Sequence, residues 1–528
     1  MDRENINNSI KKSLKDEFCV WSEVGRAVAE KEISEEYILP DYLPDIRKIL
    51  LVRVNQATNE VYKDEGKADV VGNVGFNIIY LADTGEIKCI TQEYDYETSA
   101  YVDGIYEESY LDVRTGIKNK SARAVSPRKL LLKAKIFSNV TVYNKLCVYP
   151  RIIGTTGIED EFTLERNTNT AECINYIKFS ENDIRVSEDI ILQGNRAIKE
   201  LICSDVTLSS GECDWSDGKV NIKGIAKVWL LLDMSGEGEE GIYEAVERNV
   251  PFNHAVDVTL PGGDWKISAK LEKTAFECGV ANDAYGEPKV IELDFSFKAD
   301  MLAMTNENSV FTDDVYSTEY SYTNKYKTVE TQRLVKNCNV NFSSYGNSVV
   351  PLTEGEQLDG IVFSYAEADV SGFEQKDGRG VFTGECNVKV ALKTSDGGYK
   401  TEESVFPFKY EMPLSYEGIA SCMTNCYVID HKADLDGNKL NLNAEIGMNV
   451  TIFENVKEST VEAVSIDKNA PVERSTERVM ILYYPDNNET LWSIAKKYGI
   501  ASDDITRINK IENQNALPRV ILIPTKIK

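Results

Sequence analysis

Three long segments of this chain alternate apolar and polar residues. In each segment seven positions, spaced two apart, are almost all apolar, and the residues between them are mostly polar. A period of two held over this length predicts a long β-strand with one buried face. The seven positions are Leu130, Leu132, Ala134, Ile136, Ser138, Val140 and Val142 in one segment; Ile291, Leu293, Phe295, Phe297, Ala299, Met301 and Ala303 in another; and Leu440, Leu442, Ala444, Ile446, Met448, Val450 and Ile452 in the third.

A second matched segment precedes each of these predicted strands. It is centred on Gly72, Gly224 or Gly384, and each time a polar turn follows it. Two matched segments in the same order, three times at a spacing of about 155 residues, indicate a large internal repeat. The fold class expected is therefore mainly β, with three tandem repeated β domains.

The last fifty residues follow a different pattern, typical of a small βααβ domain. Residues 479–484 and 520–524 are apolar runs that predict strands. Thr490 and Ser502 are suited to begin two helices, and Gly499 to end the first. The first helix would bury one apolar stripe, made of Leu491, Ile494, Ala495 and Tyr498.

The regions between these elements complete the predicted organisation. Ile10, Leu14, Phe18 and Trp21 have helical spacing, so a short amphipathic helix is expected near the start. Residues 458–478 lose periodicity and are expected to form a linker. The predicted order is a segment 1–32, β domain 33–147, connecting arm and β domain 148–308, connecting arm and β domain 309–457, linker 458–478, and βααβ domain 479–528.

Composition narrows the class of protein. The chain has 528 residues and a net charge of −27, which argues against nucleic acid and anionic membranes as partners. Residues 480–528 hold seven basic and five acidic side chains, whereas the rest of the chain holds 52 basic and 81 acidic side chains. No secretory signal and no apolar run of membrane-spanning length are visible. Eleven scattered cysteines are expected to be reduced, buried thiols of a cytosolic protein.

No catalytic pattern stands out. Asp41 and Asp45 form a carboxylate pair, but the neighbouring prolines and the turn chemistry of Asp explain them. His254 and His431 are expected to be surface or turn residues, and no nucleophile, phosphate-binding or metal-ligand motif surrounds them. Carboxylate-based glycosidases need no histidine, yet no candidate pair is evident. We expect a protein that is not an enzyme and holds no cofactor or metal.

The C-terminal domain resembles the LysM family, in residues 490–499, 505–509, 517–518 and 523–524. The resemblance implies a βααβ fold that binds N-acetylglucosamine glycans such as peptidoglycan, with a groove near Asn488, Glu489, Thr490 and Asn509. Asn488 and Glu489 stand where the family has Gly-Asp, and Lys510 and Ile511 where it has Pro-Asn. These substitutions argue against glycan binding.

The repeated domains are similar to SPOCS domains of spore-coat and envelope proteins. The similarity rests on residues 39–46, on 128–134 and on the repeated glycine-centred segment. This domain order resembles clostridial coat morphogenetic proteins that bind the SpoIVA-type coat ATPase. It implies a coat-assembly scaffold in the mother-cell cytoplasm, at the forespore outer surface, with other coat proteins as further partners. The alternative is an anchor that binds peptidoglycan.

Five residues of the last domain are candidates for binding the partner. Trp492 lies outside the predicted core stripe and Ile511 lies in a loop, so both are expected as exposed apolar anchors. Lys496, Lys510 and Arg519 would steer this basic surface to an acidic partner. In the alternative interpretation, Trp492 packs against the second helix or a neighbouring domain, and the charged residues are simply solvated.

Overall fold

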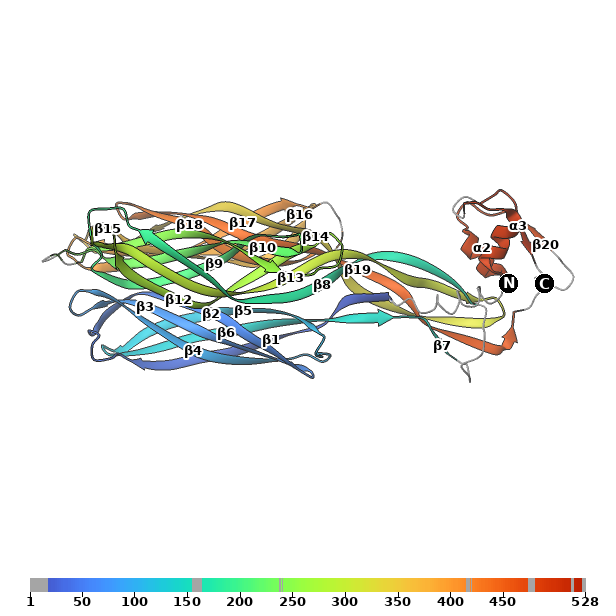
Figure 1. Cartoon of the computed structure of the whole chain (residues 1–528), viewed down its shortest axis with the longest axis horizontal. Coiled ribbons are helices and arrows are strands. Elements are labelled where there is room, and N and C mark those ends of the chain that lie inside the picture. The colour runs from blue at the N-terminus through green and yellow to red at the C-terminus, as the bar shows by residue number, and fades with distance from the viewer. Residues whose placement is uncertain are drawn as a thin grey trace.

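The computed structural model describes residues 18–153, 164–236, 239, 241–414, 418, 420–472, 480–513 and 517–524. Over these residues the chain is mainly β, and its two helices lie near the C-terminus. Long strands form a body of stacked sheets, from which a narrower arm extends toward a small separate domain (Figure 1).

The body is built from a six-stranded unit. In the first unit, strands 1, 6 and 5 form one antiparallel sheet and strands 2, 3 and 4 form another. Apolar side chains from both sheets share one core, so the unit is a β-sandwich. Its strands are β1 (Phe18–Ile38), β2 (Ile46–Asp64), β3 (Lys67–Ala82), β4 (Ile87–Tyr101), β5 (Tyr110–Ser126) and β6 (Lys129–Val148).

The same arrangement occurs twice more, which confirms the internal repeat. Each later unit again pairs its first, last and fifth strands in one sheet and its three middle strands in the other. The second unit comprises β8 (Leu164–Ile191), β9 (Glu200–Ser216), β10 (Lys219–Asp233), β11 (Tyr243–Asp257), β12 (Lys266–Asn282) and β13 (Pro288–Ser317). The third comprises β14 (Tyr320–Val349), β15 (Leu358–Lys376), β16 (Arg379–Thr394), β17 (Tyr399–Pro413), β18 (Ala420–Asp436) and β19 (Lys439–Pro471).

The three alternating segments occupy equivalent places. They form β6, β13 and β19, each the central strand of its sheet, and all their predicted buried positions are at most 3% exposed. The one polar member, Ser138, shares a buried hydrogen bond of 2.9 Å with Thr98. Burial of one complete face of a central strand explains why the period of two is so regular.

The glycine-centred segments form the central strands of the other three sheets, β3, β10 and β16. The outer faces of these sheets meet and bury a shared apolar cluster, which we call the junction. Ile79, Leu231 and Ala391, each seven residues after its glycine, are fully buried there. The three units therefore pack around the junction through equivalent residues.

A buried charge lies beside the junction. Arg53 on β2 is 1% exposed and donates to the carboxylate of Asp205 on β9. Its guanidinium also lies 4.0 Å from the ring centre of Tyr365 on β15. Arg53, Asp205 and Tyr365 pair with the fifth residue after the glycine of their respective units, so one repeat position carries a different side chain in each unit.

Four strands continue beyond the body and form the arm. The arm consists of residues 164–175 of β8 paired with 305–317 of β13, and of residues 320–333 of β14 paired with 454–471 of β19. The short β7 (Arg151–Ile153) pairs with β19 in parallel. The connecting arms predicted to precede the second and third β domains are strands where they are described, and they supply much of this arm.

Two expectations about local structure are wrong. Phe18 and Trp21 lie in β1, a strand, instead of a helix, and Phe18 packs against Phe311 of β13; Ile10 and Leu14 fall outside the described residues. Residues 458–471 continue β19 instead of forming a linker. Both segments have their partners in distant parts of the chain, and that pairing overrides the local pattern.

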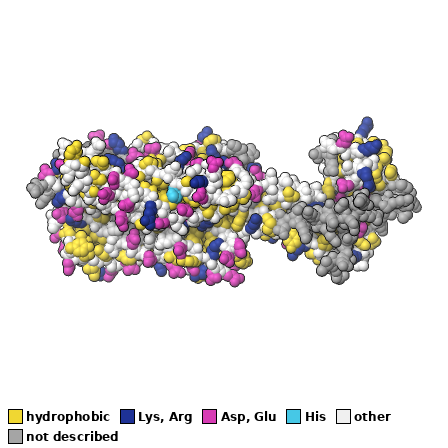
Figure 2. All heavy atoms as spheres, viewed as in Figure 1, with side chains coloured by type: hydrophobic (Ala, Val, Ile, Leu, Met, Phe, Trp, Pro, Cys, Tyr) yellow, Lys and Arg dark blue, Asp and Glu magenta, His cyan; other side chains and the backbone are white. Residues whose placement is uncertain are grey.

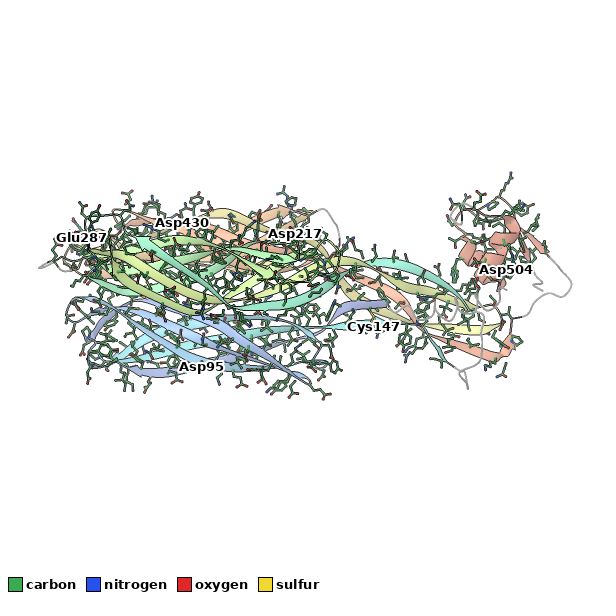
Figure 3. All side chains as sticks on the ribbon, viewed as in Figure 1. Asp95, Cys147, Asp217, Glu287, Asp430 and Asp504 are labelled. Carbon is green, nitrogen blue, oxygen red and sulfur yellow. A yellow bond between two sulfur atoms is a disulfide. The ribbon has the colours of Figure 1, made fainter. Side chains whose placement is uncertain are left out.

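The cysteines are not all reduced. Cys19 on β1 and Cys147 on β6 are directly paired across the sheet and form a disulfide, where the arm leaves the body (Figure 3). The other nine cysteines are free thiols. The expectation of reduced thiols is therefore wrong for this pair, because the strand register places two cysteines opposite each other.

Candidate functional site

The small domain beyond the arm has the βααβ order predicted from its sequence. Its elements are β20 (Met480–Tyr483), α2 (Leu491–Tyr498), α3 (Ser502–Asn509) and β21 (Ile521–Pro524), with β20 and β21 antiparallel. Thr490 caps α2 by accepting from the amide of Ser493, and Gly499 ends the helix in the left-handed conformation. Ala501, rather than Ser502, occupies the position before α3.

The core of this domain includes a residue from the arm. Tyr316, near the end of β13, is completely buried among the domain's apolar side chains. Its hydroxyl donates to the carbonyl of Ile500 at 2.7 Å, and its ring lies 4.7 Å from that of Trp492. Such a small domain has little core of its own, and the arm extends it.

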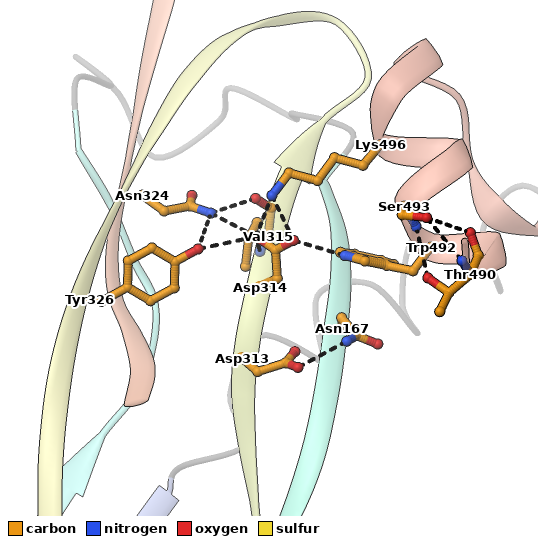
Figure 4. Close-up of polar contacts among 10 residues, drawn as sticks. All are labelled: Asn167, Asp313, Asp314, Val315, Asn324, Tyr326, Thr490, Trp492, Ser493 and Lys496. Atoms are coloured by element: carbon orange, nitrogen blue, oxygen red, sulfur yellow. Dashed lines mark hydrogen bonds and ion pairs between the residues drawn. The ribbon is translucent and has the colours of Figure 1, made fainter. Parts of the chain in front are cut away.

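Asp314, also on β13, binds two side chains of α2 (Figure 4). Its carboxylate accepts from the Trp492 indole at 2.8 Å and from the Lys496 ammonium at 2.7 Å and 2.8 Å. Burial acts to raise the pKa of Asp314, but the bonds from Lys496 and Trp492 hold that pKa below its ordinary value. Asp314 is therefore charged at neutral pH and fixes the angle of α2 on the arm.

The second helix also contacts the arm. The amide of Ser502, at the start of α3, donates to Glu165 of β8 at 3.3 Å. Burial raises the pKa of Glu165, whereas this hydrogen bond lowers it. Contacts through both helices, together with the buried Tyr316, hold the domain on the tip of the arm.

The structure uses several of the predicted partner-binding residues internally. Trp492 is half-buried against the arm, as the alternative interpretation has it, and Lys496 is paired with Asp314. Ile511 is 8% exposed and belongs to the domain core, so its prediction as an exposed anchor is wrong. Lys510, in a left-handed conformation after α3, and Arg519, before β21, are exposed.

The predicted glycan-groove residues are mostly engaged in holding the domain together. Glu489 accepts from the Tyr483 hydroxyl at 2.7 Å and 2.8 Å. Thr490 caps α2. The side-chain amide of Asn509 donates to the carbonyl of Leu522 and accepts from its amide, both at 2.7 Å. Asn488 is exposed. Three of the four residues therefore have structural roles.

An apolar surface that sequence reasoning missed lies on the outer face of the two-stranded sheet. We call it the outer apolar face: Met480, Leu482, Tyr484 and Leu522 are 48%, 55%, 61% and 36% exposed. In Figure 2 hydrophobic and basic side chains lie next to each other on this domain. Residues 480–484 are all apolar or aromatic, so the sequence predicts a strand here but does not reveal which of its faces is exposed.

His431 lies in the body, in a polar cluster, and not on the surface as predicted. Its side chain is 2% exposed and contacts the Ser364 hydroxyl at 2.9 Å and Glu247 at 3.3 Å. Burial and the nearby Lys227 lower the pKa of His431 to about 3, so the ring is neutral. It borders a cavity of about 150 Å³ between the three units, which Arg53 also lines.

Asp41 and Asp45 have no geometry suited to acid–base chemistry. Arg128 lies between them, 2.7 Å from Asp45 and 3.8 Å from Asp41, and also donates to backbone carbonyls of the same loop. Among the described residues, no group of three or more His, Cys, Asp or Glu side chains is placed to hold a metal ion. In the same part of the chain, no helix is long and apolar enough to cross a membrane.

Comparison with known proteins agrees with the βααβ geometry. Residues 487–520 match the LysM domain family, which confirms the predicted C-terminal LysM domain. A LysM domain suggests a role in binding carbohydrate, such as peptidoglycan, or in protein interaction. No curated protein and no solved structure matches the chain.

Proposed function

We propose that this chain is a non-enzymatic scaffold of spore-coat assembly that binds a SpoIVA-type coat ATPase through its LysM domain. One observation carries the proposal: the LysM domain sits on the tip of the arm and leaves its outer apolar face exposed. Four neighbouring apolar side chains on one face are typical of a protein-binding surface. Glycan binding would instead need free polar groups in the groove.

The proposed setting comes from resemblance. Three SPOCS-like units followed by LysM resemble clostridial coat morphogenetic proteins of the SipL type, and this resemblance supports a location at the forespore outer surface in the mother-cell cytoplasm. The Cys19–Cys147 disulfide counts against a reducing compartment, where disulfides are rare. Imaging of a fluorescent fusion during sporulation tests this location.

A peptidoglycan anchor is the second candidate. The match of residues 487–520 to LysM supports it, since that family usually binds N-acetylglucosamine glycans. Asn488 is the one predicted groove residue that is exposed without a structural bond in the described part of the domain. An anchor of this kind would use the groove between the loops instead of the outer apolar face.

The test offers the full-length protein to the purified ATPase and, separately, to purified peptidoglycan. The full chain is required because Tyr316 of the arm completes the LysM core. We expect binding to the ATPase, and we expect Leu482→Glu to weaken it at least about tenfold, because charge is placed on the outer apolar face. Val28→Glu is the matched control, since Val28 is 62% exposed on β1 of the first unit.

Binding to peptidoglycan alone, unchanged by Leu482→Glu, would overturn the scaffold proposal and establish the anchor. Equal loss of ATPase binding in Leu482→Glu and Val28→Glu would mean that the ATPase does not bind through the outer apolar face. Circular dichroism of each variant checks that the fold is retained.

A further inference from the structure

Two free thiols from different units face each other beside the junction. Cys89 is on β4 of the first unit and Cys203 is on β9 of the second, and their sulfurs are 3.0 Å apart. That separation is about 1 Å longer than a disulfide bond. The two cysteines are 114 positions apart in the chain, so only the packing of the units brings them together.

The surrounding contacts hold both strands at this distance. Cys89 pairs with Ile79 and Cys203 pairs with Leu231, and these two partners are equivalent buried residues of the junction. Lys88 and Glu200 form an ion pair of 2.8 Å that also joins β4 to β9. The thiols therefore meet without movement of either unit.

The amide of Ile87, two residues before Cys89, adds a third contact between the units. It donates to the hydroxyl of Tyr243 on β11 at 2.9 Å. The ion pair and this hydrogen bond therefore hold the first unit against the second close to the two sulfurs. Fixed thiols at short distance need little reorganisation to react with each other.

We infer that Cys89 and Cys203 are a built-in cross-linking site, which a peroxide oxidant converts to a disulfide that joins the first unit to the second. The Cys203 thiolate attacks one oxygen of hydrogen peroxide, the O–O bond breaks, and hydroxide leaves. Cys203 becomes a sulfenic acid. The Cys89 sulfur then attacks that sulfur, the S–O bond breaks, and the hydroxyl leaves with a proton as water.

The electrons and atoms balance: two thiols and one peroxide give one disulfide and two waters. The environment supports Cys203 as the first nucleophile. The hydrogen bond from Cys89 lowers the pKa of the Cys203 thiol, and the positive charge of Arg53 lowers it further against the effect of burial. Cys89 is partly buried and Cys203 is buried.

The test is peptide mapping of full-length protein treated with graded hydrogen peroxide. After quenching, the protein is unfolded with N-ethylmaleimide, digested without reductant and examined by mass spectrometry. We expect the Cys89–Cys203 peptide to be the first new disulfide, at least about tenfold more abundant than any other. The Cys19–Cys147 peptide is present throughout as an internal reference.

Thermal unfolding gives a second measurement. A cross-link over so long a loop restricts the unfolded chain, so peroxide-treated protein should unfold several degrees above untreated protein, which already holds the Cys19–Cys147 disulfide. Cys89→Ala should lose this difference, whereas Cys338→Ala should keep it, because Cys338 is a half-buried thiol on β14 of the third unit.

Recovery of Cys89 and Cys203 as separate maleimide-labelled peptides, at doses that oxidise Cys338, would overturn the inference. Their recovery as separate sulfinic acids would overturn it too. Both outcomes are read on the wild-type protein, so they do not depend on the folding of a variant. Neither depends on whether the LysM domain binds the ATPase.

Discussion

At the scale of single residues, the pairing of Arg53 with Asp205 distinguishes otherwise similar units. Equivalent positions carry Arg53, Asp205 and Tyr365, and all three meet beside the junction. A buried ion pair is weak support for stability by itself, but removal of one partner is costly because the other charge stays buried. The three units are therefore not interchangeable at this repeat position.

Asp205→Asn should therefore reduce the free energy of unfolding by about 3–5 kcal/mol, the usual range for a broken buried pair. Urea denaturation measures it. Asp183→Asn is the matched control, because Asp183 bonds Arg185 with both side chains largely exposed, and exposed pairs contribute little. Its unfolding should be nearly unchanged. Equal effects of the two substitutions would contradict the structural role of Asp205.

The same pair predicts a pH dependence. Burial acts to raise the pKa of Asp205, but Arg53 and Lys273 lower it below its ordinary value. A carboxyl whose folded-state pKa is lowered stabilises the fold above the unfolded-state value of about 3.9, and this contribution is lost as pH falls through the folded-state pKa. The difference in stability between wild type and Asp205→Asn should shrink below about pH 4.

At the scale of elements, the glycines at the centre of β3, β10 and β16 allow the two neighbouring strands of each sheet to lie close to the central one. A Cβ on Gly72, Gly224 or Gly384 would lie 2.1–2.7 Å from a backbone carbonyl of the preceding strand. Each glycine also faces an aromatic ring directly across the sheet, from Tyr96, Phe252 or Phe408. The register of that preceding strand shifts close to each glycine, so glycine, bulge and aromatic ring recur as one device.

Gly72→Ala should therefore lower the free energy of unfolding by about 1–3 kcal/mol, the range for overpacking in a tight core. Gly75→Ala, three residues later in β3, is the matched control, since its Cβ would meet only the side chain of Glu93 at 3.7 Å. Thermal unfolding compares the two. A Gly72→Ala variant as stable as Gly75→Ala would contradict the close approach.

Some elements could be predicted from the sequence and others could not. Strands β6, β13 and β19 were predictable over their body portions because one face is wholly buried. The far end of β19 was not predictable. In the arm its partners are β14 and the short β7, and buried and exposed side chains no longer alternate regularly along it. The LysM elements were predictable because local caps such as Thr490 and Gly499 define their ends.

At the scale of the whole molecule, the position of the LysM domain depends on contacts that the sequence does not reveal. Trp492 and Asp314 are 178 positions apart, and no local pattern links them. The same holds for Tyr316, which the sequence places in an arm but the structure places in the LysM core. The domain type was predictable, whereas the surface that remains free was not.

Asp314→Asn should loosen the LysM domain from the arm, because an amide cannot hold the Lys496 ammonium as a carboxylate does. Hydrogen exchange of α2 should become several-fold faster in the variant. Asp313→Asn is the control, since Asp313 bonds Asn167 at 3.1 Å and lies away from Lys496 (Figure 4). Unchanged exchange in Asp314→Asn, or the same increase in both variants, would contradict docking through Asp314.

The long strands of the arm have a mechanical consequence. β19 runs from the core of the third unit to Pro471 at the tip, and β14 pairs with it along almost its whole length. Tension applied along these strands loads the perpendicular hydrogen bonds of the ladder in shear, so many must break together instead of one after another. A pull on the LysM end would then reach the body as force along the paired strands of the arm, without the ladder opening one bond at a time.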